Sequence, residues 1–259
     1  MEAETLLRSG DITGARSWLA AELRRQPGDA HLRQFFWQLI AVMGEWDKAE
    51  QQLITLSSAE PKAMMLASVY GQAITAMRQR ERVIAGTERA TSLVGSEPWV
   101  EALLDAQHMH FKTPGGAAAA LDTAMADAPA SAGSLDGEAF EWLADADPRF
   151  GPTLEAVIGS HYGVVPFAAL KRIKVTEPVD LRDTVWLQVE LETRTGQVSM
   201  AFVPVLYPGT VAVSDSALTL ARRTDFIEAN GVDTGLGQKL LTTDGPEAGI
   251  LGVRDIRFG

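Results

Sequence analysis

The N-terminal part of the chain repeats itself when the sequence is shifted by 34 positions. The repeated positions hold glycine, alanine, leucine and proline, at Gly10, Ala15, Leu19 and Pro27 and again at Gly44, Ala49, Leu53 and Pro61. A period of about 34 residues is typical of tetratricopeptide helix pairs, in which a small residue allows close helix contact and a proline ends the unit. Apolar residues at helical spacing accompany the repeat, so residues 1–127 are predicted to form tetratricopeptide-like helical hairpins.

Two clear units are fewer than the roughly three that an independent solenoid needs. A looser third unit begins near Lys62, and an Ala-rich fragment over 98–125 follows it. An ordinary array of helical hairpins therefore remains the alternative. Either array would offer a groove to a peptide or an amphipathic helix, and neither is typical of an enzyme.

The composition changes after residue 127. Residues 128–134 are small and rich in helix-breaking residues, and they are predicted to be a linker. Beyond them, Val185, Leu187 and Val189 alternate with polar residues, as expected for a half-buried strand. Residues 135–259 are therefore predicted to form a mixed domain with an antiparallel sheet, which makes the whole chain α+β.

Three elements of this second domain can be placed on the sequence. A β-hairpin is expected over 184–205, because the apolar alternation returns after a turn at 194–196. A last strand is expected over 250–258, and a short helix over Glu138–Leu143.

Composition limits the possible partners and the location of the protein. The chain has 34 acidic and 23 basic residues and a formal net charge of −11, which disfavours nucleic acid and anionic lipid as partners. No stretch approaches the roughly 18 apolar residues of a membrane helix, and the acidic N-terminus does not resemble a signal peptide. Cysteine is absent, and a cytoplasmic location is expected.

The passage from 140 to 152, F-E-W-L-A-D-A-D-P-R-F-G-P, concentrates aromatic, acidic and proline residues. Its carboxylates at Glu141, Asp145 and Asp147 could bind a divalent metal and support a hydrolase. The spacing lacks the glycine and glutamate of a calcium loop, so a structural role in capping a turn is favoured. The residues given this role are Trp142, Asp145, Asp147, Pro148, Gly151 and Pro152.

A second group of charges lies beside Trp186. Asp180, Arg182 and Asp183 alternate in sign, and we expect them to orient a loop through short-range ion pairs.

Other candidate motifs for catalysis are weak. His108 and His110 are two positions apart and would lie on different faces of a helix. The triplet at 233–235, D-T-G, occurs only once, whereas the aspartic-protease mechanism needs two. No G-x-S-x-G motif or phosphate-binding glycine loop is present. We therefore expect neither an enzyme nor a cofactor.

A helix-binding groove would depend on a few large apolar contacts. The candidates for such partner contacts are the aromatic residues Phe35, Trp37, Trp46, Trp186 and Tyr207. Each of them could equally be part of the core, since large aromatic side chains are mostly buried.

Several motifs together resemble the ImpE/TagJ family, also described as SciE-type virulence proteins. The resemblance begins with the passage at 140–152 and continues through Tyr162, the segment 180–183 and Trp186. It extends through further motifs at 165–167, 207–209, 220–226, 235–238 and 253–258. The helical N-terminal half also fits, so nearly the whole chain is covered.

The resemblance implies a non-enzymatic accessory protein of the bacterial type VI secretion system. Members of the family bind the small subunit of the contractile sheath, through that subunit's N-terminal helix, and are linked to sheath disassembly by the ClpV ATPase. The resemblance does not identify the binding surface or the oligomeric state. A general protein-interaction scaffold and a metal-dependent hydrolase remain the alternatives.

Overall fold

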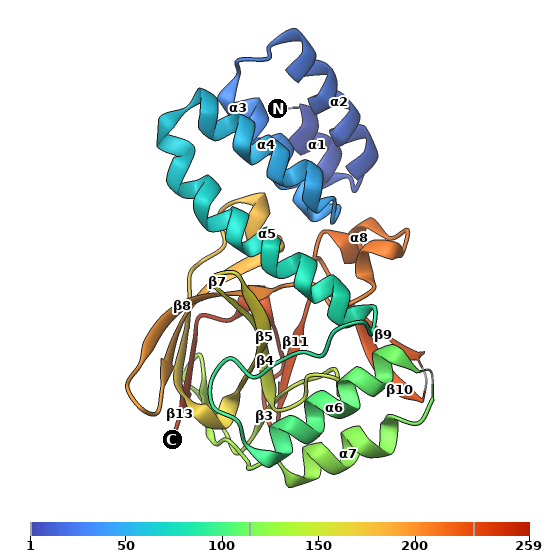
Figure 1. The fold of residues 1–259 in the computed structure, drawn as a ribbon, viewed down its shortest axis with the longest axis vertical. Helices are drawn as coiled ribbons and strands as arrows, with labels where there is room; N and C mark the ends of the chain where they lie inside the picture. Colours follow the sequence, from blue (N-terminus) through green and yellow to red (C-terminus); the bar gives the residue numbers. More distant parts are fainter. Residues whose placement is uncertain (1, 114, 230) are drawn as a thin grey trace.

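In the computed structural model, residues 2–113, 115–229 and 231–259 are described (Figure 1). The N-terminal part consists of four helices in two antiparallel hairpins: α1 (Glu2–Arg8), α2 (Ile12–Arg25), α3 (Ala30–Val42) and α4 (Trp46–Ala59). Helices α2 and α4 are displaced by the predicted 34 positions. The helical hairpins are therefore confirmed, while their tetratricopeptide superhelix stays a prediction.

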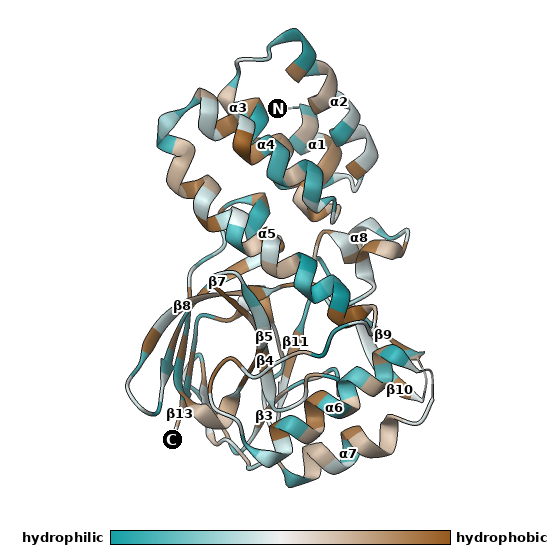
Figure 2. Cartoon of the chain, in the orientation of Figure 1, coloured by the Kyte–Doolittle hydropathy of each residue, from teal (hydrophilic) through white to brown (hydrophobic). Residues whose placement is uncertain are grey.

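The repeated glycines lie in the two turns inside these hairpins. Gly10 and Gly44 have φ of +86° and +69°, a conformation that favours glycine. Asp11 caps α2 and Asp29 caps α3, because each side chain accepts backbone N–H groups of the first turn of its helix. In Figure 2 these helices carry apolar and polar residues side by side, as expected for helices with one buried face.

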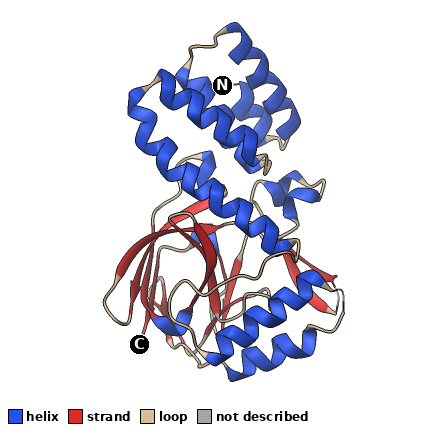
Figure 3. Cartoon of the chain, viewed as in Figure 1, coloured by secondary structure: helices blue, strands red, loops and turns tan. Residues whose placement is uncertain are grey.

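The long helix α5 (Met64–Ile84) leads from the hairpins to the sheet (Figure 3). Its first half contributes Tyr70 and Ile74 to the core of the helical hairpins. Its second half contributes Ala76 and Val83 to a core shared with the sheet. Helix α5 therefore belongs to both halves of the molecule.

Helices α6 (Pro98–Lys112) and α7 (Ala118–Asp127) pack beside the sheet rather than on the N-terminal hairpins (Figure 1). Leu103 and Leu121 share a core with Tyr162 and Val164 of the sheet. The sequence division at 128–134 stays a prediction, but in space the change from helical hairpins to sheet domain occurs along α5.

The main sheet is antiparallel and has the strand order β2-β1-β13-β6-β7-β8-β4-β5. Its strands are β1 (Gly133–Leu135), β2 (Glu138–Phe140), β4 (Thr153–Ile158), β5 (His161–Pro166), β6 (Leu170–Val175), β7 (Trp186–Thr193), β8 (Val198–Pro204) and β13 (Asp255–Phe258). The expected hairpin over 184–205 is confirmed as β7–β8, with Val189 opposite Ala201. The final strand expected over 250–258 is confirmed only in its second half, as β13, because residues Ile250–Gly252 form a 3₁₀ turn.

The predicted helix over Glu138–Leu143 is wrong. Asp136 and Gly137, with φ of +51° and +95°, form a tight turn that folds β2 back onto β1. An Asp-Gly pair with two positive φ values is the preferred two-residue hairpin turn. Residues 143–145 are strand β3 (Leu143–Asp145), which pairs with β11 (Leu240–Thr243).

The remaining elements cover the open side of the sheet domain. Strand β12 (Ala248–Gly249) extends the small β3–β11 sheet, and β9 (Thr224–Ala229) and β10 (Val232–Gly237) form a separate hairpin. The short helix α8 (Ser216–Thr219) precedes β9. Across the described ranges, no helix combines the length and apolarity that a membrane crossing requires.

An aromatic cluster joins the helical hairpins to the sheet. The Trp186 ring at the start of β7 lies 6.4 Å from that of Trp37 on α3, 5.6 Å from Trp46 on α4 and 5.5 Å from Tyr70 on α5. Phe202 of β8 packs 5.3 Å from Tyr70. Tilted aromatic contacts at these separations add to the burial energy, and through Trp186 the sheet contributes directly to the core of the helical hairpins.

Candidate functional site

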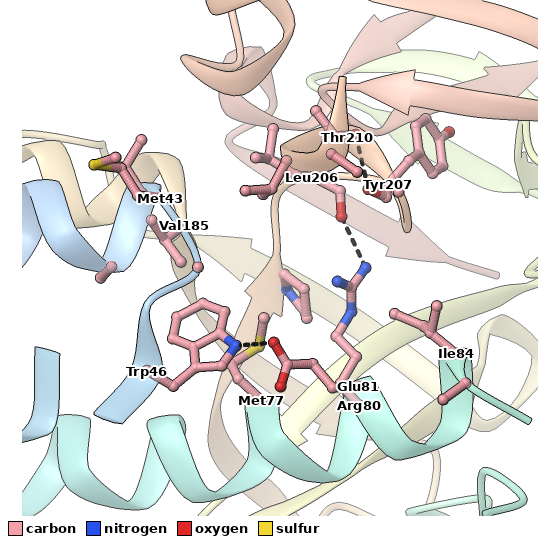
Figure 4. Close-up of a pocket in the computed structure, with 18 residues that line it drawn as sticks. Met43, Trp46, Met77, Arg80, Glu81, Ile84, Val185, Leu206, Tyr207 and Thr210 are labelled. Carbon is pink, nitrogen blue, oxygen red and sulfur yellow. Dashed lines mark hydrogen bonds between the residues drawn. The ribbon is translucent and has the colours of Figure 1, made fainter. Parts of the chain in front are cut away.

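A groove of about 360 Å³ lies where the α3–α4 turn, helix α5 and the segment after β8 meet (Figure 4). Its wall is largely apolar and comes from three places far apart in the sequence. The residues that matter most for its shape are Met43, Trp46, Met77, Ile84, Leu206 and Val211. Methionine adapts to apolar partners of different shape, which suits a binding surface.

Local backbone geometry fixes the two loops at the mouth of this groove. Gly44, with its positive φ, turns the chain from α3 into α4, and Val211 packs against it. Gly209, with φ of +89°, allows the sharp turn after Tyr207. The Thr210 hydroxyl donates to the Tyr207 carbonyl at 2.8 Å and accepts from Gly237 N–H at 2.8 Å, which ties this loop to β10.

Two polar groups of helix α5 border the groove. Glu81 accepts the Trp46 indole N–H at 2.5 Å. Arg80 donates to the Leu206 carbonyl at 2.8 Å in the opposite wall, and its Nε donates to Glu155 at 2.6 Å (Figure 4). Arg80 therefore connects the groove wall to the buried interior of the sheet domain.

Beneath the groove, Arg80 is part of a buried network of charges. Glu155 of β4 also accepts the Tyr162 hydroxyl at 2.6 Å and lies 3.0 Å from the Lys239 ammonium. Lys239 lies 3.1 Å from Asp145. The chain thus contains a fully buried lysine held between two buried carboxylates.

The network continues into the 140–152 passage. Asp145 accepts the Tyr207 hydroxyl at 2.5 Å and the Asp147 N–H at 3.0 Å. Asp147 accepts the Arg149 N–H at 3.0 Å and the Gly235 N–H at 2.8 Å, and it forms an ion pair with the Arg149 guanidinium. The buried cations Arg80, Arg149 and Lys239 balance the buried anions Asp145, Asp147 and Glu155.

The network moves the pKa of its carboxylates in opposite directions. Burial alone would raise the pKa of Glu155, but the charges of Arg80 and Lys239 outweigh it and lower the pKa to about 2. Burial raises the pKa of Asp145, and Lys239 only partly offsets this. Burial and the Asp145 charge also raise the pKa of Tyr207, so its hydroxyl remains a hydrogen-bond donor.

This difference predicts the acid sensitivity of the fold. The pKa of Glu155 is about 2 when folded, against an ordinary value of 4.5. The stability from its ionisation is therefore fully present above pH 4.5 and is lost as the pH falls towards 2. The pKa of Asp145 is raised by folding, so the titration of Asp145 favours the folded state as the pH falls. We expect the unfolding free energy, measured by urea denaturation between about pH 6 and pH 3, to fall less steeply in Glu155→Gln than in the unsubstituted protein. Equal slopes would contradict the role given to Glu155.

The three acids of the metal-binding alternative do not converge. Glu141 is exposed and its N–H donates to Asp244, whereas Asp145 and Asp147 are buried against cations. Within the described ranges, no group of three or more His, Asp or Glu side chains is arranged to hold a metal ion. The three acids therefore do not form the shared metal site on which the hydrolase alternative depends.

The other residues of the 140–152 motif shape its turn. The Asp145 N–H donates to the Gly151 carbonyl at 2.7 Å, and Gly151 has φ of +46° between Pro148 and Pro152. Trp142 is 40% exposed and lies outside the network.

The 140–152 motif packs against β10, β11 and the loop after β8. It also contacts helix α6, because Gln107 donates to the Arg149 carbonyl at 2.8 Å and the Arg149 guanidinium lies 5.6 Å from the centre of the Phe111 ring.

The second charged segment also has local partners. Asp180 and Asp183 form a capping box at the 3₁₀ turn Leu181–Thr184, and Asp183 accepts the N–H groups of Val179 and Asp180 at 2.8 Å. The Arg182 guanidinium lies 5.2 Å from the centre of the Tyr70 ring. This loop is therefore held against the aromatic cluster.

The D-T-G triplet and the two histidines lie in unrelated surroundings. Gly235 is required because a Cβ there would lie 2.3 Å from the Tyr207 ring, while Asp233 is exposed. His108 contacts the Glu88 carbonyl at 3.2 Å, and His110 is buried beside Phe111.

The five aromatic residues predicted to contact a partner differ in burial. Trp37, Trp186 and Tyr207 are buried, although Tyr207 is also one of the residues that line the groove. Trp46 is also largely buried, but it lines the groove with its indole. Phe35 is partly buried against the helical core. Of the five aromatic residues, Trp46 and Tyr207 line the groove, and the contact of any of the five with a partner stays a prediction.

Sequence patterns singled out Asp145 and Asp147 of the network and Trp46 and Tyr207 of the groove, but missed most of the other residues that build them. Met43, Met77 and Val211 are far apart in the chain, so no spacing rule connects them. Glu155 and Lys239 did carry a signal, since each is a lone charge within an apolar strand segment, T-L-E-A-V-I and Q-K-L-L.

Helical hairpins joined to an antiparallel sheet, with an apolar groove between them, define an α+β protein. The family model for ImpE protein matches residues 137–257. Over the full chain, 38% of residues are identical to the type VI secretion system accessory component TagJ of Pseudomonas aeruginosa, and 91% of that protein is covered. The resemblance seen in the motifs is confirmed: the chain belongs to the ImpE/TagJ family.

The same architecture occurs in a solved structure. The crystal structure of protein VPA1032 from Vibrio parahaemolyticus matches with a TM-score of 0.87, covering 100% of this chain and 98% of that one. The two sequences are 20% identical, so this match shows a shared fold.

Proposed function

We propose that this protein is a non-enzymatic accessory component of a bacterial type VI secretion system. In this role it binds the small subunit of the contractile sheath through the N-terminal helix of that subunit, and is thereby linked to sheath disassembly by the ClpV ATPase. Family membership supports the assignment to the secretion system, because the Pseudomonas aeruginosa relative carries that name.

The groove is the observation that carries the binding role. Its volume of about 360 Å³ is near the lower end of the roughly 300–1,000 Å³ of ligand pockets. That space suits one or two large apolar side chains rather than a whole helix. An amphipathic helix would therefore lie across the mouth and insert its apolar anchors, as in other helix-in-groove complexes.

Placing a charge on the rim of the groove tests this role. Val211 is 46% exposed at the mouth, so Val211→Lys should leave the fold intact but place an ammonium group where an apolar anchor enters. We expect binding of the sheath small subunit to weaken at least about tenfold, measured by calorimetry, since losing one apolar hot spot costs about 1–2 kcal/mol.

Val198→Lys is the matched control. Val198 is 58% exposed on β8, opposite Glu192, where a lysine would be accepted. It should bind like the unsubstituted protein. A pull-down with the sheath subunit lacking its first helix completes the test, and undiminished binding would replace helix capture with a general scaffold role.

A further inference from the structure

The charges around the groove are not all balanced. Glu45 is paired with Arg16 at 2.8 Å and with Lys48 at 2.5 Å. Arg78 pairs with Asp47 at 2.6 Å and with Glu50 at 2.7 Å. The acids on this face of the hairpins therefore have their own cations.

Glu81 differs from these neighbours. In the part of the chain that the structure describes, no lysine, arginine or histidine lies within ion-pair distance of its carboxylate, and its hydrogen-bond partner is the neutral Trp46 indole. The adjacent Arg80 turns the other way, to Leu206 and Glu155. Glu81, which is exposed, thus has no cationic partner among the described residues and lies on the rim of an apolar groove (Figure 4).

The hydrogen bond from Trp46 fixes the position of the Glu81 carboxylate before a partner binds. The indole N–H holds one oxygen in place, and the second oxygen still has room for further donors. Charge attraction is stronger beside an apolar, partly desolvated surface than in open water. A carboxylate fixed in this way favours a cationic donor from a partner over any neutral group.

We propose that Glu81 determines which helices the groove accepts, by pairing with a lysine or arginine of the bound helix. The proposal rests on the helix-binding function above and specifies its chemistry. The partner helix presents a large apolar residue to the groove and a basic residue three or four positions away, so that both lie on one face. The net charge of −11 brings such a basic helix to the protein.

Glu81→Gln tests the pairing without disturbing the groove. Glutamine keeps an oxygen that can accept the Trp46 N–H, but it has no charge. The probe is a synthetic peptide of the first helix of the sheath small subunit, titrated by calorimetry at low and high salt. We expect Glu81→Gln to bind about tenfold more weakly at low salt and to show a flatter salt dependence.

Changing the peptide separates the charge pair from a general effect. Each lysine and arginine of the peptide is replaced in turn by glutamine. We expect one of these peptide replacements, at the residue that pairs with Glu81, to weaken binding to the unsubstituted protein. The same replacement should not change the affinity of the peptide for Glu81→Gln. Glu138→Gln, an exposed acid on β2 at the far edge of the sheet, is the matched control and should bind normally with an unchanged salt dependence.

The outcomes distinguish this proposal from the function on which it rests. If the peptide binds and Glu81→Gln behaves like the unsubstituted protein, the charge pair is wrong and groove binding stands. If the unsubstituted protein does not bind the peptide, both are overturned. A lower melting temperature of Glu81→Gln, with unchanged affinity and salt dependence, would give Glu81 a structural role only.

Discussion

Replacing Lys239 with methionine should lower the unfolding free energy by about 3–5 kcal/mol, because it leaves the buried Asp145 without its cation and leaves Glu155 with Arg80 alone. The Lys239 ammonium lies between Asp145 and Glu155, and it also lies 3.7 Å from the centre of the Phe150 ring. Methionine fills a similar volume, so the loss measured by urea denaturation reports on charge rather than on packing.

Lys171→Met is the control for this substitution. Lys171 pairs with Glu192 at 2.6 Å, but its side chain is 62% exposed. Exposed ion pairs contribute about 0–1 kcal/mol, so this variant should be nearly as stable as the unsubstituted protein. Equal losses for the two lysines would mean that the buried network does not depend on its central cation.

Trp186→Ala should cost about 3–5 kcal/mol, the usual range for removing a fully buried tryptophan. The side chain is 0% exposed and contacts the aromatic rings of α3, α4 and α5. Its loss leaves a cavity between the helical hairpins and the sheet. We therefore expect chemical denaturation to begin at lower urea, and limited proteolysis to cut the N-terminal hairpins first.

Two comparisons make this result specific. Trp142→Ala removes a tryptophan that is 40% exposed and should cost less than about 1 kcal/mol. Trp186→Phe keeps an aromatic ring and removes a buried indole N–H that has no hydrogen-bond partner within the described chain. It should therefore lower the unfolding free energy less than Trp186→Ala does. If Trp186→Ala and Trp142→Ala cost the same, the aromatic cluster does not join the two halves.

Local signals in the sequence were sufficient for much of the fold. The glycines of the 34-residue repeat mark the two hairpin turns, and the β7–β8 alternation is strong enough to define register. The helix expected over 138–143 failed because β2 and β3 have three residues each, too few to show a period. The Asp136-Gly137 turn was the informative signal there.

The candidate groove could not be inferred in the same way. Large aromatic residues are predicted to be partner contacts, and Trp37 and Trp186 are buried in the core. The groove depends on Met43, Met77 and Val211, whose proximity is a product of tertiary packing. The single charge in the T-L-E-A-V-I segment pointed to a buried ion pair, but only the fold shows that its partners are Arg80 and Lys239.

The continuity of α5 determines how the groove can work. A helix of 21 residues is about 30 Å long, and this one is anchored at one end in the hairpins and at the other in the sheet (Figure 1). Because α5 is packed in both halves, the two walls of the groove are fixed relative to each other and do not close by a hinge motion. In the proposed binding role, the protein would therefore lose little conformational entropy when the helix binds. Most of the conformational entropy lost on binding is then lost by the partner segment as it becomes helical. The affinity should therefore rise with the helical content of the free segment.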